Sequence, residues 1–374
     1  MDFGFSPEQQ AVLEAASKLL SDKSSPESLV RLEKSSLVFD RDLWGELARS
    51  GLLCLAIPER YGGAGLTILE GCVLLVEQGK NLSPVPLLPN IVAGLILSKY
   101  ANEHIKEKYL PSIATGEIIA SVGLPSLTIP DEYSMRSLFG SEFRIGHQSG
   151  YELSGMLSCV RGATISNVLI VPFCAQDSIR RIAVVDVKAP GVQIERIVTT
   201  DLQESGAVYL GNVRVMSEDI IADENDDPLR LLVQSYSVGV CALQYGVCDQ
   251  AVKLTARYVS ERHQFGKPLA SFQAVALRAA DAFIDSEAIG ATMWNAAWNL
   301  SEGYECESEV QVAKWWASEA GHRVIHAVQH LHGGMGADIT YPIHRFFLWG
   351  KQLDLEIGSG PLMLARLGRA LVGK

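Results

Sequence analysis

The stretch RYVSERHQFGKPLASFQAV, residues 257–275, decides how this sequence is interpreted. It follows a long segment in which apolar residues recur at helical spacing. Gly266 can act as a helix C-cap, and the proline two residues later cannot continue a helix. The sequence therefore predicts one helix that ends near Phe265 and another that begins at Ser271. Arg262 falls in the last turn of the first helix, where the helix dipole favours a cation. Taken alone, the stretch is typical of a capped surface helix.

Composition limits the classes of protein to consider. A chain of 374 residues is too long for one simple core and predicts two or three domains. The net charge is −11 and there is no block of Lys and Arg, so we expect neither nucleic acid nor a membrane as the main partner. The seven cysteines are scattered, odd in number and never spaced C-x-x-C, which predicts reduced thiols. The N-terminus has no signal-peptide pattern, so we expect a cytoplasmic protein.

Helical and strand patterns alternate along the chain. Ser6 and Pro7 are typical N-cap and N1 residues, and the pattern from residue 6 to about 120 is helical. Short β-branched runs such as VLIVPF (168–173) predict an antiparallel sheet or barrel up to residue 221. From residue 228 the helical pattern returns. The fold class we expect is α+β and mostly α, with domains 1–117 (helical), 118–226 (β) and 227–374 (helical). Further helices are expected over 42–51, 69–79, 92–100 and 103–113.

Four segments resemble the acyl-CoA dehydrogenase family, in the same order and across nearly the whole chain. The pattern R-x-Q-F-G-x-P followed by F-Q-A-V is similar to the family's flavin-binding segment. The other three are WGELARSGLLCLAIPERYGGAGL (44–66), GYELSGMLSCVRGATISNVLIV (150–171) and VQHLHGGMGADITYPIHRFF (328–347). The resemblance implies an N-terminal helical domain, a middle antiparallel β-barrel domain and a C-terminal four-helix bundle.

The resemblance also implies a reaction and a cofactor. The family oxidises an acyl-CoA thioester to its 2-enoyl form: a carboxylate removes the α-proton, and the β-hydrogen leaves as hydride to FAD. Burial of that carboxylate would raise its pKa toward neutrality, which suits proton transfer. Electron-transfer flavoprotein is the oxidant that the resemblance implies, in a pathway such as β-oxidation. The FAD-binding residues implied here are Arg262, Gln264, Phe265, Gln329, His330, Gly333 and Gly334.

Each of these residue types suits a dinucleotide. The planar guanidinium of Arg262 can bind phosphate oxygens through two N–H groups, in the family on the pyrophosphate of a neighbouring subunit's FAD. Gln264 and Phe265 would line the same channel. Glycines at 333 and 334 would let the backbone approach the cofactor closely. A purely structural helix cap accounts for the same two glycines almost as well.

The chain departs from the family pattern at several positions. His330 stands where the family usually has Gln, and Val160 stands near a usual Trp. The loop that normally covers the flavin corresponds to LPSLTIPDEYS (124–134), which lacks the family's Thr-Glu and Gly-Ser-Asp residues. The catalytic Glu is also missing. In one group of members its position corresponds to Ile357, with Glu356 one residue early and turned by about 100° in a helix. In another group it corresponds to Leu243, so we assign no catalytic residue.

These losses predict a subunit of a heteromeric, α2β2-type assembly in which a second acyl-CoA dehydrogenase-like subunit supplies the base. The C-terminal run YPIHRFFLWGKQLDLEIGSGPLMLARLG (341–368) resembles the partner-type subunit of enzymes that shorten steroid side chains. Two alternatives remain open at this point. One is a self-sufficient homomeric dehydrogenase that uses Glu356 or another carboxylate. The other is a structural subunit that binds neither flavin nor substrate. For the heteromeric assembly we expect a tetramer.

A metal site is a competing interpretation of the histidines. His322, His326 and His330 recur every four residues, and His332 follows. Two histidines at this spacing share a helix face and can bind zinc. No H-E-x-x-H motif, carboxylate or thiol joins them, so we expect no metal and a packed helix face in its place.

Overall fold

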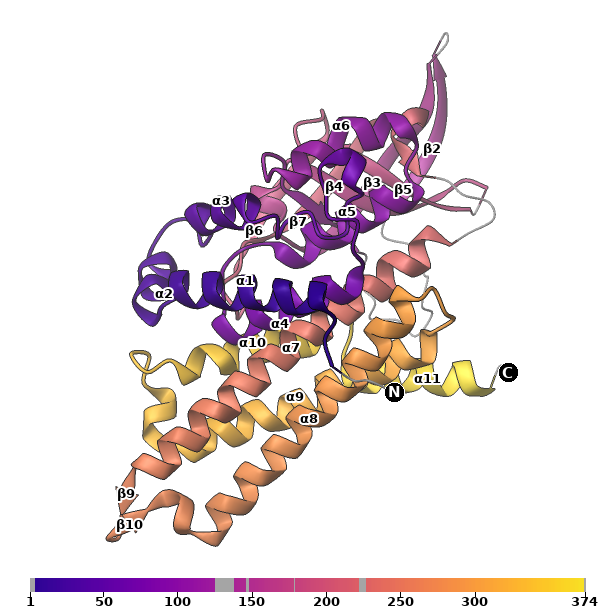
Figure 1. Cartoon of the computed structure of the whole chain (residues 1–374). Coiled ribbons are helices and arrows are strands. Elements are labelled where there is room, and N and C mark those ends of the chain that lie inside the picture. The colour runs from indigo at the N-terminus through magenta and orange to yellow at the C-terminus, as the bar shows by residue number, and fades with distance from the viewer. Residues whose placement is uncertain (1–3, 125–137, 146–147, 178, 222–226, 373–374) are drawn as a thin grey trace. The chain divides into compact units, whose positions relative to one another are not determined.

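A computed structural model describes residues 4–124, 138–145, 148–177, 179–221 and 227–372. The chain forms two compact units, each with its own internal packing. The first unit comprises Met1–Arg31, Cys72–Ser83 and Ser237–Lys374, and the second comprises Leu32–Gly71 and Pro84–Tyr236. The long C-terminal helices belong to the first unit and the large sheet belongs to the second (Figure 1).

Helices occupy both ends of the sequence and strands occupy its middle. The helices are α1 (Pro7–Lys23), α2 (Pro26–Glu33), α3 (Arg41–Arg49), α4 (Ile68–Asn81), α5 (Leu87–Tyr100), α6 (Glu103–Ala114), α7 (Pro228–Glu261), α8 (Gln273–Ser301), α9 (Glu307–His332), α10 (Ile343–Leu355) and α11 (Gly360–Val372). The strands are β1 (Ala120–Val122), β2 (Leu138–Ile145), β3 (Gln148–Arg161), β4 (Val168–Ala175), β5 (Arg180–Asp186), β6 (Val192–Ile197), β7 (Ser205–Met216), β8 (Ile220–Ile221), β9 (His263–Gln264) and β10 (Lys267–Pro268).

Capping residues and apolar spacing in the sequence predicted the N-terminal helices correctly. The Ser6 hydroxyl accepts a hydrogen bond from the Gln9 N–H, and the Gln9 side chain accepts one from the Ser6 N–H. This reciprocal capping box satisfies two N–H groups that a helix start leaves free. The Asp40 carboxylate caps α3 in the same way, by accepting from the Leu43 N–H at 2.9 Å. The helices expected over 69–79, 92–100 and 103–113 are confirmed as α4, α5 and α6.

The predicted helix end near Phe265 is wrong. Helix α7 ends at Glu261, and β9 and β10 then form a two-stranded hairpin in which Lys267 pairs with Gln264. Phe265 and Gly266 form its turn, with φ of 52° and 78°. Two successive positive φ angles are typical of the tight turn that joins antiparallel strands, so Gly266 is a turn residue and not a C-cap. After this hairpin, α8 begins two residues later than predicted.

In the first unit, α4 and α7 cross with their backbones in close contact. A Cβ atom on Gly246 of α7 would lie 2.1 Å from the carbonyl oxygen of Val76. A Cβ atom on Gly79 of α4 would lie 2.3 Å from the carbonyl oxygen of Leu243. Each glycine therefore faces the main chain of the other helix, and no side chain fits at either position. The crossing therefore fixes the backbone of α7 at Leu243, the position that by the resemblance corresponds to the base of some family members.

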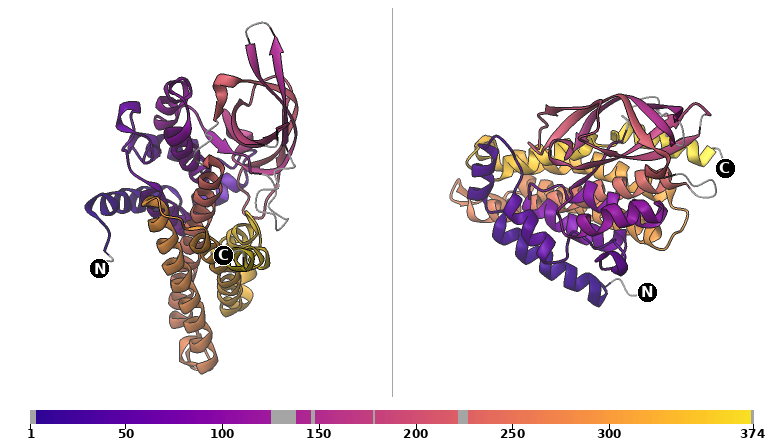
Figure 2. Two further views of the ribbon diagram at one scale, coloured as in Figure 1. Left: turned by 90° about the vertical axis from the view of Figure 1, so that its right-hand side faces the viewer. Right: turned by 90° about the horizontal axis from the view of Figure 1, so that it is seen from above.

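The second unit is built on an eight-stranded sheet, and the expected barrel is not confirmed. The main path runs β6-β7-β3-β2-β4-β5-β8, and β1 pairs with β4 away from this path. The sheet is strongly curved (Figure 2), but β6 and β8 end the path, and no pairing among the described residues closes it. The sheet is also mixed, because β1 and β2 both run parallel to β4. Closure depends on pairing between strands far apart in sequence, which local patterns do not reveal.

The inward face of this sheet carries the apolar residues that the strand patterns predicted. Two irregularities interrupt the β3–β7 pairing, between residues 153 and 155 and between 157 and 160. Such irregularities bend a strand and increase its twist, which contributes to the curvature. The buried cluster includes Leu138, Leu153, Leu157, Val160, Leu169, Val171, Phe173, Val185, Val208 and Val213.

In the described part of the chain, one helix is long and apolar enough to cross a membrane by length and composition. This is α7, but 83% of its most apolar window is buried inside the protein. Its residues from 237 onward pack in the core of the first unit, where Gly290 of α8 lies against the Tyr245 ring. The apolar character of α7 is therefore that of a core helix.

Candidate functional site

The two candidate flavin-binding segments lie at neighbouring helix ends in the first unit. Tyr258, in the last turn of α7, stacks on the His332 ring at the end of α9 with centroids 4.4 Å apart. The Tyr258 hydroxyl also donates to the His332 carbonyl oxygen at 3.4 Å. Tyr341 contacts both rings, at 6.0 and 5.3 Å. This aromatic cluster joins the segment that carries Arg262 to the segment that carries the glycine turn.

Arg262 lies directly after α7. Its N–H donates to the Tyr258 carbonyl oxygen at 2.8 Å, and its own carbonyl oxygen accepts from the Leu269 N–H at 2.8 Å. These bonds fix the backbone of Arg262 between the helix and the hairpin. Its side chain is exposed and has no hydrogen bond or ion pair among the described residues. It is therefore a fixed cation with a free guanidinium.

The hairpin presents Gln264 and Phe265 to solvent. Phe265 is 92% exposed, and its ring lies edge-on to the Phe272 ring with centroids 6.2 Å apart. Gln264 is exposed and donates to the neighbouring His263 carbonyl oxygen at 2.8 Å. Covering a ring with this exposure would remove apolar area from water and so stabilise a complex. The tip of the hairpin thus has the character of a surface that contacts a partner or a ligand.

The glycine turn is open to solvent. Helix α9 ends at His332, and the 3-10 turn η5 (Gly333–Ala337) follows. Gly333 has a φ of 57°, and a Cβ atom on Gly333 or Gly334 would meet no atom within 4 Å. No described residue therefore requires a glycine at 334. A ligand that approaches the backbone from outside would account for it, and the turn fits a dinucleotide in this respect.

Gln329 and His330, in the last turn of α9 before the glycine turn, differ in burial. The Gln329 amide donates to the Gly336 carbonyl oxygen, whereas its own buried oxygen has no partner among the described residues. His330 is exposed. His332, which was not among the expected cofactor residues, is buried, and burial lowers its pKa. A neutral His332 suits the stack on Tyr258. The sequence signal for this cluster was a Tyr one turn before Arg262.

Neither position where the family carries its base holds an acid. Leu243 is 1% exposed, and its carbonyl oxygen lies against Gly79. Ile357 has a φ of 65°, in the left-handed region that β-branched residues rarely adopt. Glu356 lies just before it, where its N–H donates to the Gln352 carbonyl oxygen at 3.1 Å and ends α10. The residues that align with LPSLTIPDEYS lie outside the described part of the chain from 125 onward, while Val160 is buried in β3.

A buried lysine that the sequence reading missed holds the end of α10. Lys314 is fully buried in α9 and donates to the Ser318 hydroxyl at 2.7 Å. It also donates to the carbonyl oxygens of Leu353 and Asp354, at 3.3 and 3.0 Å. Burial lowers the pKa of Lys314. The sign of this role in the sequence was a lysine on the apolar face of a predicted helix. The Lys314 hydrogen bonds fix the end of α10, directly before the turn that contains Glu356.

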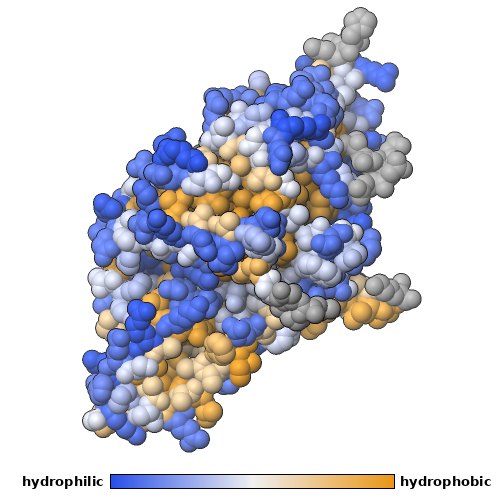
Figure 3. All heavy atoms as spheres, in the orientation of Figure 1, coloured by the Kyte–Doolittle hydropathy of each residue, from blue (hydrophilic) through white to orange (hydrophobic). Residues whose placement is uncertain are grey.

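The histidines do not form a metal site in the described part of the chain. The His322 ring lies 3.0 Å from the Lys351 ammonium and 3.4 Å from the Asp354 carboxylate. The His326 ring packs edge-on against Phe347, and burial lowers its pKa. The two histidines line a groove of about 510 Å³ between α8 and α9. Apolar side chains gather along α8 on the face that Figure 3 shows.

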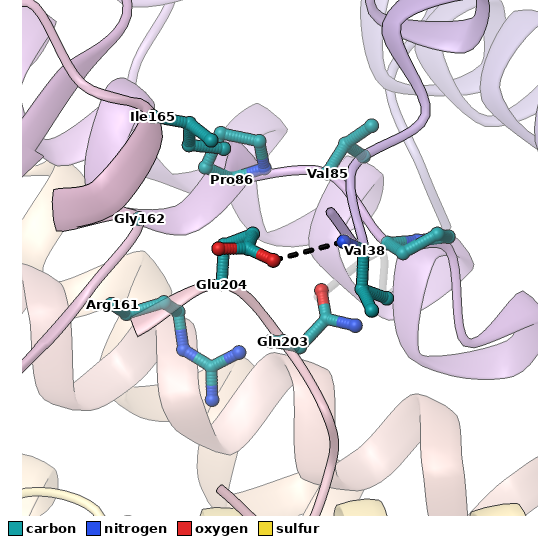
Figure 4. A pocket seen from close by; sticks show the side chains of 9 residues that line it. Val38, Val85, Pro86, Arg161, Gly162, Ile165, Gln203 and Glu204 are labelled. Carbon is teal, nitrogen blue, oxygen red and sulfur yellow. Dashed lines mark hydrogen bonds between the residues drawn. The ribbon is translucent and has the colours of Figure 1, made fainter. Parts of the chain in front are cut away.

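A second, much smaller pocket lies in the second unit and is structural (Figure 4). At its centre the buried Glu204 carboxylate accepts from the Val38 N–H at 2.9 Å and from the Thr164 hydroxyl at 2.6 Å. It also pairs with the Arg196 guanidinium at 2.7 Å. The pocket holds about 10 Å³, too little for a ligand. Glu204 thus joins the segment before α3 to the sheet of the same unit.

Comparison with known proteins identifies the class. Residues 6–117 match the family "Acyl-CoA dehydrogenase, N-terminal domain", and residues 236–372 match "Acyl-CoA dehydrogenase, C-terminal domain". The chain belongs to the acyl-CoA dehydrogenase family, whose members are FAD-dependent oxidoreductases acting on CH–CH bonds. The resemblance seen in the sequence is therefore confirmed.

Three relatives cover almost the whole chain. Acyl-CoA dehydrogenase FadE27 of Mycobacterium tuberculosis is 32% identical over 99% of each chain. A chain in the crystal structure of the ChsE4–ChsE5 complex from Mycobacterium tuberculosis is 31% identical, with a TM-score of 0.93 over 100% of each chain. A chain of a Tcur3481–Tcur3483 steroid ACAD variant is 35% identical, with a TM-score of 0.91 over 98% of each chain. These two structures are each named after two different proteins.

Proposed function

We propose that this chain is one subunit of a heteromeric acyl-CoA dehydrogenase that converts a steroid side-chain acyl-CoA to its 2-enoyl-CoA. In this proposal a second acyl-CoA dehydrogenase-like subunit carries the catalytic Glu. The observation that supports it most is the pair Leu243 and Ile357, which are apolar at both family positions for the base. The similarity to a chain of the ChsE4–ChsE5 complex and to a chain of the Tcur3481–Tcur3483 steroid ACAD variant supports it independently.

The proposed FAD contacts of this chain are Arg262, Gln264, Phe265, Gln329, His330, Gly333 and Gly334. Most of them are exposed: the free guanidinium, the hairpin tip and the open glycine turn all face solvent. A dinucleotide bound only to these residues would stay largely in water. We infer that another subunit covers it, so that the site is shared between chains.

The residues of this chain would perform different tasks in such a shared site. FAD supplies the hydride acceptor for the bound acyl-CoA. The Arg262 guanidinium would bind phosphate oxygens through two N–H groups, and its fixed backbone would hold it in place. Phe265, once covered, would exclude water from the same channel. The Lys314 bonds would keep the Glu356 turn rigid beside the site. No residue of this chain is assigned to remove the proton.

The remaining features of the proposal follow from the family. The domain division we propose is 1–117, 118–226 and 227–374, which the family matches to residues 6–117 and 236–372 support. Electron-transfer flavoprotein would reoxidise the flavin, the assembly would be a tetramer, and the protein would be cytoplasmic. The self-sufficient alternative needs Glu356 as base. Under that alternative Glu356→Gln abolishes dehydrogenation, whereas under our proposal activity of the complex persists.

The Arg262 assignment has a direct test. Arg262→Ala in the purified complex should lower the flavin content per protein, because the exposed guanidinium is the cation free to bind pyrophosphate. Arg262→Lys keeps the charge but not the planar pair of donors and should restore flavin only partly. The matched control is Arg257→Ala, which removes an exposed arginine in the last part of α7, shortly before Arg262, and should leave flavin unchanged. Equal flavin content in Arg262→Ala and wild type would refute the assignment.

A further inference from the structure

The imidazole ring of His332 is buried, and one of its two nitrogen atoms lacks a hydrogen bond. His332 is 2% exposed, and its Nδ1 lies 2.7 Å from the Val328 carbonyl oxygen. Because a carbonyl oxygen only accepts, Nδ1 carries the proton of the neutral ring and Nε2 keeps a lone pair. Nε2 is buried and has no hydrogen-bond partner among the described residues. The neutral ring therefore has a single tautomer, which α9 itself fixes.

This ring joins separate elements of the first unit. Tyr258 of α7 stacks on it with ring planes inclined by 24°, and Tyr341, which precedes α10, lies against it with planes inclined by 48°. Tyr258 stands one turn before Arg262, and its carbonyl oxygen accepts from the Arg262 N–H. His332 directly precedes Gly333 at the start of the glycine turn. The separation between the Arg262 backbone and the glycine turn therefore depends on this stack of rings.

We propose that His332 is a positioning residue for the dinucleotide that the Arg262 segment and the glycine turn bind together. Its ring holds the ends of α7 and α9 at one fixed separation, so that the Arg262 guanidinium and the open backbone at Gly333 and Gly334 can bind one molecule. His332 itself does not touch the dinucleotide, because its side chain is buried. This inference rests on the proposed FAD contacts and names the residue that holds them together.

Protonation of His332 opposes this arrangement. A proton on Nε2 would place a charge and a new N–H group in a buried position where no described residue accepts it, while Nδ1 stays bonded to Val328. Burial accordingly lowers the pKa of His332, and the hydrogen bond to Val328 opposes this shift only in part. The charged ring can regain water only by leaving the stack, which releases the glycine turn. The turn is therefore held above about pH 6.5, the ordinary pKa of histidine, and is released progressively as the pH falls below it.

Other charged or titratable groups stand on the elements that meet at this ring. They are Arg257 and Glu261 on α7, Arg262 directly after it, His330 on α9, Asp338 after η5, and His344 and Arg345 on α10. Of the two histidines in this set, His344 is bonded to the cluster, since its Nδ1 lies 2.7 Å from the Tyr341 carbonyl oxygen. A pH effect on the cluster can therefore be assigned only when His332 and His344 are changed separately.

Amide hydrogen exchange of residues 333–338 in the full-length chain tests the release of the turn and does not depend on flavin. In wild type the equilibrium constant for opening should rise by up to about 10-fold between pH 6.5 and 5.5, because one proton is taken up over one pH unit. His332→Phe keeps a stacked ring that cannot be protonated, so it should match wild type at pH 7.5 and exchange more slowly than wild type at pH 5.5. His344→Gln is the control and should keep the wild-type pH dependence. Comparison of variants at the same pH removes the intrinsic pH dependence of exchange.

The FAD dissociation constant of the co-purified complex tests the positioning role itself. His332→Ala removes two ring contacts, each worth about 2- to 12-fold in an equilibrium constant, and should weaken FAD binding by about 10-fold at pH 7.5. His332→Phe should bind FAD within about 3-fold of wild type at pH 7.5 and should lose less affinity than wild type at pH 5.5. Where circular dichroism shows that His332→Ala does not fold, the pH comparison between His332→Phe and wild type decides.

The outcomes distinguish this proposal from the FAD contacts on which it rests. The proposal is overturned if His332→Phe exchanges and binds FAD like wild type at pH 5.5, or if His344→Gln alone abolishes the pH dependence. If Arg262→Ala weakens FAD binding and a folded His332→Ala does not, the FAD contacts stand and the positioning role is wrong. If neither variant weakens FAD binding, the proposed FAD contacts are wrong, and the positioning role fails with them even where the exchange result holds.

Discussion

The crossing of α4 and α7 gives a prediction whose size follows from the structure. In Gly246→Ala, the new Cβ atom would lie 2.1 Å from the Val76 carbonyl oxygen and 3.0 Å from the Lys80 nitrogen. Both are backbone atoms, which cannot swing away as the end of a side chain can. Because non-bonded carbon contacts are most favourable beyond about 3.5 Å, the two helices must separate by about 1 Å.

The expected cost is the balance of two terms. Overpacking of a well-packed core costs about 1–3 kcal/mol, and at a backbone contact we expect the upper part of this range. Alanine in place of glycine within a helix returns about 1 kcal/mol. Gly246→Ala should therefore lower the free energy of unfolding by about 1–2 kcal/mol. The backbone conformation itself offers no strain, since Gly246 lies within a regular helix.

Urea unfolding of the full chain, followed by circular dichroism, measures this change. The matched control is Gly368→Ala in α11, where a Cβ atom would meet nothing within 4 Å. That change should stabilise α11, by about 0.5–1 kcal/mol, because only the helix propensity differs. If Gly246→Ala is as stable as wild type or gains stability as the control does, the close backbone contact does not exist as described.

Two further predictions concern buried polar groups. Glu204→Ala should lower the free energy of unfolding by about 2–4 kcal/mol, because it leaves the Val38 N–H and the Thr164 hydroxyl without an acceptor. The ion pair with the partly exposed Arg196 adds little to this loss. A loss below about 1 kcal/mol would contradict the role of Glu204. Burial raises the pKa of Cys241 to about 12 and also raises that of Cys248. These thiols stay protonated in the folded state, whereas unfolded thiols ionise near pH 8.5, so stability is full below that pH and falls as pH rises toward 12. From pH 7.5 to 9.5 the loss should be about 1.4 kcal/mol per thiol, and Cys241→Ala/Cys248→Ala should remove it; an equal pH dependence of urea unfolding in wild type and double variant would show that the thiols are not the cause.

The sequence predicted the features that local chemistry determines. Ser6 and Gln9 cap α1 through bonds between residues three apart, and Pro7 stands at its first position, so the helix start could be predicted directly from the sequence. The same reasoning failed at Gly266, because a positive-φ glycine serves a helix end and a hairpin turn alike. The signal for the turn was its length of two residues, 265 and 266, between short strands. Phe265 concealed this signal, because hairpin turns do not favour Phe at positive φ.

Features that depend on distant residues were out of reach. The close approach at Gly79 and Gly246 joins two helices between which α5, α6 and the strands β1–β8 lie in the sequence, and neither glycine stands out in a helical pattern. The stack of Tyr258 on His332 likewise joins α7 to α9. The candidate flavin residues came from the family resemblance and not from spacing alone, and their roles stay predictions. The sequence alone shows that positions 243 and 357 hold Leu243 and Ile357 and not an acid, because residue identity is known without a structure.

The central claim is that the flavin site is shared and that the base belongs to the partner. The most direct measurement is the visible absorption spectrum of this chain purified alone and of the same chain co-purified with its candidate partner, each before and after addition of a steroid side-chain acyl-CoA. Flavin absorbance that appears only in the co-purified complex, and bleaches there when the acyl-CoA is added, is the predicted result. A chain that is yellow when purified alone and bleaches with the acyl-CoA would contradict the account, because the chain would then hold FAD and a base of its own.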